Sequence, residues 1–426
     1  MQIVVVRPGE SIWAIANRFG VSPNVIIDIN QLADSTRLVP GQALVIPNST
    51  GYHIIQSGES IWALAGRYGV TVDQLLQANP EINPMQLTVG TRIKIPSEPK
   101  PTIETNGYLE PKGTERDAKI VKEDASALTY FSLFSYQVKK DGSLTPPKDE
   151  KALSAIQETN SMPMMVLTNF TEGNFSPDIT RSIFTDNERI NKLIDSVLAT
   201  MKSKGYGALN IDFERIYPDD RELYNAFLRK IATRVRQAGY LISTALAPKK
   251  SAEQTGPWYS AHDYAAHGQI VDFVILMTYE WGWSGGPPMA VSPLPQVEEV
   301  VKYALSVMPA DKIMMSAPLY GYDWTLPYKK GGDFAPLVDP QEAIQIAWKR
   351  GAVIQYDTEA QAPYYNYYDD AGKKHVVWFE DARSIQAKYK LIKQWKLRGI
   401  SYWVLGNDFP QSWALLQSEF NIKKLR

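Results

Sequence analysis

Hydrophobic and polar positions repeat along the first hundred residues of the chain. Residues 3–47 align with residues 52–96 at a constant offset of 49 and without a gap. In the first copy, a β-branched run at residues 3–6 precedes a Pro-Gly turn, and apolar side chains then follow helical spacing over residues 12–19. A second short helix and a closing apolar run complete each copy. The pattern therefore predicts two small βααβ domains.

A different pattern begins after residue 103, where short apolar or β-branched runs alternate with longer amphipathic stretches. Eight runs are predicted as strands, at residues 104–109, 127–135, 162–169, 208–213, 241–247, 273–278, 312–319 and 400–405. Eight strands that alternate with helices predict an α/β protein with a (β/α)8 TIM barrel. A doubly wound open sheet is the rival fold, but no Gly-rich phosphate loop follows any strand.

Turn residues and prolines divide the chain into segments. A Tyr-rich segment at about residues 323–380 is predicted as a small α+β insertion with a β-hairpin around residues 369–372. A proline-rich spacer at residues 96–101 joins the second repeat to the barrel segment. It is expected to be semi-rigid and to restrict the angle between the repeats and the barrel. The predicted boundaries are a first repeat at residues 1–48, a second at 51–97, a linker at 98–102 and the barrel at 103–426.

Composition narrows the function. The 426 residues contain 45 basic and 46 acidic side chains, four histidines and no cysteine. A net charge of −1 argues against a nucleic-acid or anionic-membrane binder, and the absence of cysteine excludes disulfides and thiol catalysis. No apolar run approaches the ~20 residues of a membrane helix, and residues 1–6 lack the features of a secretion signal. We expect a monomer that uses no metal and no cofactor and is made without the ordinary export signal.

Three polar residues mark the end of the fourth predicted barrel strand. Asn210, Asp212 and Glu214 occupy alternate positions, so they share one face of the strand, and Ile211 and Phe213 share the other. Two carboxyl groups in one apolar site cannot both ionise freely, which favours the protonated form that a general acid requires. The pattern indicates glycosidic bond cleavage, although an isolated Asp-x-Glu is more often a solvated loop.

The repeated motif, with Gly-Glu-Ser-Ile-Trp, a later Asn and a closing Ile-Pro, resembles the LysM domain, which binds N-acetylglucosamine-containing glycans. Each copy is close to neutral, which favours hydrogen-bonded, multivalent recognition. We expect Trp13 and Trp62 to lie in the domain cores. The resemblance implies glycan contacts from the loop after the first strand and the loop before the second, at Gly9, Ser11, Ile12, Asn30, Gly58, Ser60, Ile61 and Asn79.

The barrel segment resembles glycoside hydrolase family 18. Residues 206–214 match the end of its fourth-strand Asp-x-x-Asp-x-Asp-x-Glu motif, with Asn210 and Gly207 in place of the first two aspartates. Further matches are Met277-Thr278-Tyr279-Glu280 where the family has Met-x-Tyr-Asp, and Tyr402-Trp403 on the eighth strand.

This resemblance implies retaining, substrate-assisted hydrolysis. Glu214 would be the general acid/base, and Asp212 would orient the substrate's own acetamide, whose oxygen is the nucleophile. Tyr279 would bond that oxygen, and Trp403 would form the floor under the −1 sugar. Asn210 is expected to hold Asp212 by a hydrogen bond, and Asp212 and Glu214 to bond each other. Met277 and Glu280 are expected near the substrate, with the role of Glu280 open.

Aromatic residues after the sixth strand suit a sugar groove. Trp281 and Trp283 lie in a Gly-rich loop and can stack on pyranose rings. Residues 364–368, four of them tyrosines, fit either a groove wall or a β-hairpin.

Two LysM-like modules before a family 18-like barrel resemble the spore cortex-lytic N-acetylglucosaminidases of spore-forming bacilli. The resemblance implies cleavage of N-acetylglucosamine linkages in spore-cortex peptidoglycan fragments during germination, by an enzyme made in the mother cell and located in the spore coat or cortex region. Glycan strands are then the expected partner, with no nucleic acid and no membrane. The alternatives are a chitinase that acts on chitin oligomers, a non-catalytic sugar-binding barrel and a structural coat protein.

Overall fold

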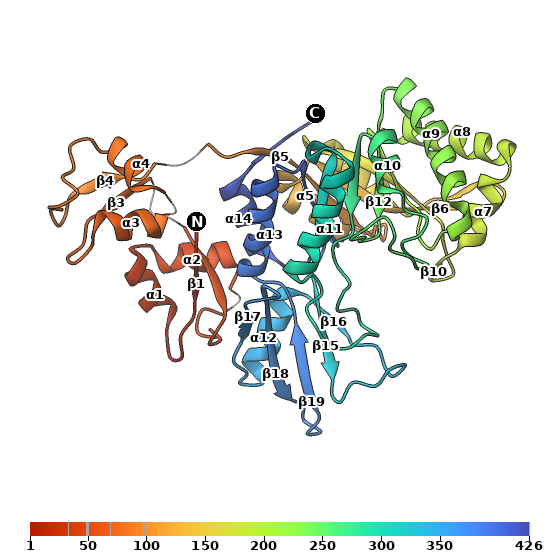
Figure 1. Ribbon diagram of the computed structural model, residues 1–426. Helices are drawn as coiled ribbons and strands as arrows, with labels where there is room; N and C mark the ends of the chain where they lie inside the picture. The colour runs from red at the N-terminus through yellow and green to blue at the C-terminus, as the bar shows by residue number, and fades with distance from the viewer. Residues whose placement is uncertain (33, 48–50, 69, 97–98, 426) are drawn as a thin grey trace.

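The computed structural model describes residues 1–32, 34–47, 51–68, 70–96 and 99–425. The two repeats lie on one side of a larger domain that contains the barrel (Figure 1). Residue 48, the predicted end of the first repeat, and residues 97 and 98, where the second repeat and the linker were predicted to meet, lie outside the described residues. No helix within the described ranges is long and apolar enough to span a membrane.

Each repeat has the predicted βααβ order, and its two strands form an antiparallel pair. In the first repeat, Ser11 caps α1 by accepting a hydrogen bond from the backbone N–H of Ala14, and Gly20 ends the helix in the left-handed conformation. The elements are β1 (Gln2–Val5), α1 (Ile12–Phe19), α2 (Pro23–Asn30) and β2 (Ala43–Ile46), then β3 (Tyr52–Ile54), α3 (Ile61–Tyr68), α4 (Val72–Gln77) and β4 (Arg92–Lys94).

Eight parallel strands form the barrel, and it closes because the last strand pairs with the first. Each strand falls on one of the eight predicted runs, which confirms the (β/α)8 fold. In order around the barrel they are β5 (Thr102–Leu109), β6 (Tyr130–Val138), β8 (Met162–Thr168), β11 (Ala208–Asp212), β12 (Leu241–Leu246), β13 (Phe273–Leu276), β14 (Ile313–Pro318) and β20 (Gly399–Trp403).

Helices surround these strands and bury their apolar faces against them. They are α5 (Glu115–Asp124), α6 (Glu150–Gln157), α7 (Pro177–Phe184), α8 (Asn187–Lys204), α9 (Arg221–Gln237), α10 (Tyr264–Ile270), α11 (Leu294–Val307), α13 (Ala382–Trp395) and α14 (Pro410–Glu419). Short strands extend the barrel at β7 (Leu144–Thr145) and β21 (Asn421–Ile422), and β9 (Phe170–Thr171) pairs with β10 (Asn174–Phe175).

An antiparallel sheet and one helix project from the barrel between β14 and α13 (Figure 1). Pairing of β18 with β19 confirms the predicted hairpin and places the tyrosines of residues 364–368 in a strand. The sheet order is β16 (Leu337–Val338), β15 (Gly321–Thr325), β19 (Lys374–Trp378), β18 (Ala362–Tyr368) and β17 (Gln355–Asp357), and α12 (Pro340–Lys349) packs with it.

The first repeat is docked on the barrel domain. Strand β2 packs against α13 and α14, and its Ala43 and Val45 belong to the main apolar core of the barrel domain. The backbone N–H of Ile354 donates to the Pro40 carbonyl at 2.9 Å, and Arg383 donates to the Gly41 carbonyl at 3.1 Å. This repeat and the barrel therefore share a core.

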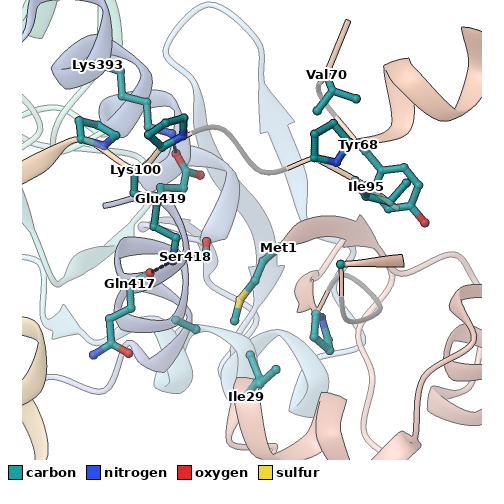
Figure 2. A pocket seen from close by; sticks show the side chains of 16 residues that line it. Met1, Ile29, Tyr68, Val70, Ile95, Lys100, Lys393, Gln417, Ser418 and Glu419 are labelled. Carbon is teal, nitrogen blue, oxygen red and sulfur yellow. Dashed lines mark hydrogen bonds and ion pairs between the residues drawn. The ribbon is translucent and has the colours of Figure 1, made fainter. Parts of the chain in front are cut away.

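The second repeat has an apolar core of its own. Figure 2 shows a pocket where it meets the first repeat and helices α13 and α14, with Tyr68 and Ile95 facing Lys393 and Glu419 across it. None of the predicted catalytic side chains lines this pocket.

Candidate active site

The polar residues of the fourth barrel strand gather at its carboxyl end. Asn210 and Asp212 lie on β11, and Glu214 lies two residues beyond the last residue of this strand. All three side chains are buried, while Ile211 and Phe213 pack on the opposite face in the core shared with the surrounding helices. The predicted alternation is present in the structure, and it brings two carboxyl groups into one buried site.

Burial changes the acidity of this carboxyl pair. It raises the pKa of Asp212 to about 7. Burial and the neighbouring charge of Asp212 raise the pKa of Glu214 well above the ordinary carboxyl value, against a smaller opposing effect of Arg215. Oδ1 of Asp212 is buried without a hydrogen-bond partner. Both shifts favour a protonated carboxyl group, which is the form that general acid catalysis requires.

Two predicted hydrogen bonds are wrong for this structure. The Asn210 side chain accepts from the hydroxyl of Tyr108 at 2.9 Å and donates to the hydroxyl of Ser243 at 2.9 Å, and it makes no bond to Asp212. The carboxyl groups of Asp212 and Glu214 do not bond each other either. Strands β5 and β12 supply the partners of the amide, so Asn210 supports the barrel interior.

Tyr279 follows β13 and Trp403 ends β20, so both lie at the carboxyl end of the barrel. The charges of Asp212 and Glu214, together with burial, raise the pKa of Tyr279, which places its hydroxyl in their field. Tyr279 and Trp403 pack against a common apolar cluster, and the Trp403 ring contacts Tyr108 edge to face, with 5.4 Å between ring centroids. Met277 is half-buried just beyond β13. Tyr279 therefore lies close to the carboxyl pair, and Trp403 packs against Tyr108, whose pKa is raised by burial and by the charges of Asp212 and Glu214.

Glu280 has partners that the sequence did not reveal. Its backbone adopts the left-handed conformation at φ 67°. Its carboxylate accepts hydrogen bonds from Tyr320 and Tyr322, the latter at 2.9 Å. The residue as a whole is exposed, yet its carboxylate is held at the start of the projecting sheet. Glu280 therefore links the β13 loop to the insertion.

The two tryptophans of the loop after β13 differ. Trp281 is half-buried and packs against the main core. Trp283 is exposed and packs against Phe334, which makes it the better candidate for sugar stacking. Gly286 is required there, because a Cβ atom would lie 2.4 Å from the indole nitrogen of Trp283. Trp324 of the insertion donates to the Gly286 carbonyl at 3.0 Å and holds the loop in place.

Two buried residues that the sequence analysis missed hold the backbone at Phe213 and Glu214. Asn169, just after β8, donates to the Glu214 carbonyl at 2.8 Å and accepts from its N–H at 3.0 Å. His262 accepts from the N–H of Ala247 at 2.8 Å and donates its other ring proton to the Phe213 carbonyl at 3.0 Å. Burial lowers the pKa of His262 to about 4, so the ring is neutral in this role. The sequence signal for Asn169 is its position as a polar residue at the end of a predicted strand. No local sequence pattern points to His262.

Replacement of Asn169 by alanine should reduce kcat about 10–100-fold and change KM by less than about twofold, because the Glu214 carboxyl loses its fixed position. Steady-state kinetics on soluble fragments measures both constants. A loss of thermal stability with kcat unchanged would show that Asn169 serves the fold alone.

The structure corrects several predictions for the repeats. Ile12 and Ile61 are core residues. Asn30 and Asn79 are buried, and each makes two hydrogen bonds to the closing strand and one to a carbonyl of the helix before it. The predicted glycan contact is wrong for these four side chains. Gly9, Ser11, Gly58 and Ser60 lie on surface loops. Trp13 and Trp62, expected in the cores, are 67% and 55% exposed beside these loops.

Comparison with known proteins agrees with this geometry. The model of glycosyl hydrolases family 18 matches residues 104–408, and the LysM model matches residues 4–47 and 53–96. The chain is 52% identical over 427 residues to the cortical fragment-lytic enzyme of Bacillus subtilis strain 168, covering 100% of this chain and 99% of that protein.

Solved structures agree as well. The spore cortex-lytic enzyme SleL of Bacillus megaterium QM B1551 superposes with a TM-score of 0.90 at 43% identity, covering 100% of this chain and 99% of that one. A chitinase from Chromobacterium violaceum has a TM-score of 0.68 at 22% identity, covering 74% of this chain and 98% of that one, and shows the shared fold only. The chain belongs to glycoside hydrolase family 18, as a member that carries two LysM domains.

Proposed function

We propose that this protein is a spore-cortex peptidoglycan hydrolase that cleaves N-acetylglucosamine linkages in cortex fragments during germination. The observation that carries the proposal is the buried Asp212–Glu214 pair at the carboxyl end of a family 18 barrel, where burial raises the pKa of both carboxyl groups. The full-length similarity to cortical fragment-lytic enzymes supports the choice of substrate. We propose that the protein acts as a monomer in the spore coat or cortex region, after synthesis in the mother cell.

In the proposed mechanism, Glu214 protonates the glycosidic oxygen while the acetamide oxygen of the −1 sugar attacks the anomeric carbon. Asp212 orients the acetamide and stabilises the oxazolinium ion, and Tyr279 donates a hydrogen bond to the acetamide oxygen. Trp403 supports the sugar from below. Glu214 then removes a proton from water, which opens the oxazolinium ring with retention of configuration.

Product analysis tests the reaction. Muropeptides from purified spore cortex, previously opened by a lytic transglycosylase, are incubated with the enzyme and examined by mass spectrometry. The expected products have new reducing-end N-acetylglucosamine. Cleavage of chitin oligomers without cleavage of cortex fragments would instead support a chitinase, and binding without any new product would support a non-catalytic sugar-binding barrel.

The repeats are proposed to hold the enzyme on insoluble glycan, with contacts from Gly9, Ser11, Gly58, Ser60 and their neighbours. Replacement of both Trp13 and Trp62 by alanine should weaken retention on insoluble cortex about 10-fold or more, because two linked weak sites bind by avidity and each loses an exposed aromatic surface. Sedimentation with purified cortex measures retention. Turnover of soluble fragments should stay unchanged, and an equal loss on both substrates would contradict the proposed division of labour.

A further inference from the structure

The residue after the proposed acid is an unneutralised cation. Arg215 has a left-handed backbone at φ 53° and an exposed side chain. Among the described residues it forms no ion pair, and its guanidinium carbon lies 4.3 Å from the centroid of the Trp258 ring. A guanidinium stacked on an aromatic ring retains free N–H groups at its edge, and these suit a carboxylate.

The loop that carries Trp258 is fixed to the strand that carries the carboxyl pair. His262, at the end of this loop, bonds the Phe213 carbonyl. The buried amine of Lys249 donates to the His262 carbonyl at 3.3 Å, and the Gly256 N–H donates to the Ser260 hydroxyl at 3.0 Å. The His262 bond holds the loop against the end of β11, and the other two bonds brace the loop internally. The Arg215–Trp258 pair is therefore held in a fixed position beside Glu214.

The charge of Arg215 acts at the catalytic centre, since it opposes the rise in the pKa of the Glu214 carboxyl. A general acid contacts the oxygen that joins the −1 sugar to its leaving group. Arg215 follows the acid directly, and its left-handed backbone turns it out of the strand direction. It is thus well placed to contact the leaving sugar.

We propose that Arg215, supported by Trp258, binds a carboxylate on the muramic sugar at the leaving-group side of the scissile bond. This inference rests on the proposed function. A muramic sugar carries a lactyl ether that ends in a carboxylate or in a short peptide with its own carboxylate. Chitin has neither group, so this contact would favour peptidoglycan over chitin.

Three soluble substrates test the proposal: a muramic-containing cortex fragment, the same fragment with its carboxylates converted to amides, and a chitin oligomer. Arg215→Gln should raise KM for the native fragment about 10-fold, the loss expected for one hydrogen-bonded charge pair. Its KM for the amidated fragment and the chitin oligomer should match that of the wild type. Added salt should raise the wild-type KM for the native fragment only.

Arg229→Gln is the matched control, because Arg229 is exposed on α9 on the outside of the barrel. It should leave all three KM values unchanged. Fragments that end in the free lactyl acid or in a single alanine show which carboxylate is bound, as the larger KM change identifies it.

An equal loss on all three substrates would show that the Arg215–Trp258 contact only braces the loop, and would overturn the proposal. An unchanged KM for the native fragment would overturn it too, while leaving the proposed function intact. Wild-type enzyme that cleaves the chitin oligomer and no muramic fragment would overturn the proposed function itself.

Discussion

Glu214→Gln should lower the hydrolysis of cortex fragments by about 10³-fold, because the amide keeps the shape of the side chain but cannot donate a proton to the leaving oxygen. Fragment turnover followed by mass spectrometry measures the loss. Retention on insoluble cortex should be unchanged, since the repeats are not altered. Full activity of the variant would refute the assignment of Glu214 as the acid.

The same substitution should stabilise the fold at neutral pH. A buried carboxyl with a raised pKa stays protonated in the folded state at a pH where the unfolded chain already ionises, so its contribution to stability is present at low pH and is lost as pH rises toward the folded pKa. For Asp212 this window runs from about pH 4 to about 7. Asp212→Asn and Glu214→Gln should each raise Tm by about 3–6 °C at pH 8.

The Tm gain should nearly vanish close to pH 4, where the carboxyl groups of the folded and unfolded wild type are both largely protonated. Differential scanning calorimetry at pH 4 and pH 8 makes the comparison. A gain of the same size at both values would show that packing, and not the buried charge, is responsible.

Gly41→Ala should destabilise the protein far more than Gly90→Ala. The two glycines are equivalent positions of the repeats and share a φ of +87°, so both substitutions carry about 1–2 kcal/mol of backbone strain. At Gly41 the new Cβ would also lie 1.8 Å from the carbonyl oxygen of Ile354, whereas at Gly90 it meets nothing within 4 Å. The clash should add about 1–3 kcal/mol by separating the first repeat from the barrel domain.

Thermal and denaturant unfolding of both variants measures this difference, and hydrogen exchange in α13 and α14 shows whether the docking surface opens. Equal destabilisation by the two substitutions would mean that the first repeat is only loosely attached. Gly90→Ala thus separates the effect of backbone conformation from the effect of docking.

The barrel could be predicted because apolar residues are spaced differently in strands and in helices. Each of the eight strands corresponds to a short apolar run in the sequence. The same alternation placed Asp212 and Glu214 on one face. The bonding of Asn210 could not be predicted, because its partners Tyr108 and Ser243 lie 102 and 33 residues away along the chain. His262 was missed for the same reason, since its target is a backbone carbonyl 49 residues away.

The exposure of Trp13 could have been predicted from its position. The buried residues of α1 are Ile12, Ile15 and Ala16, and residue 13 falls off this helical phase. The expectation that a tryptophan belongs in a core outweighed the spacing. Docking of the first repeat had no comparable signal, because Gly41 looks like an ordinary turn glycine until the loop that contains Ile354 is placed against it.

The shared core of the first repeat and the barrel domain has a consequence for how the enzyme searches its substrate. A module on a flexible tether would let the proposed active site reach any point within an area around the attachment point. A module fused through α13 and α14 gives the proposed active site one fixed direction relative to any glycan strand that the module holds. The position of the bound module would then determine how far along the glycan strand, and in which direction, the next bond is cleaved.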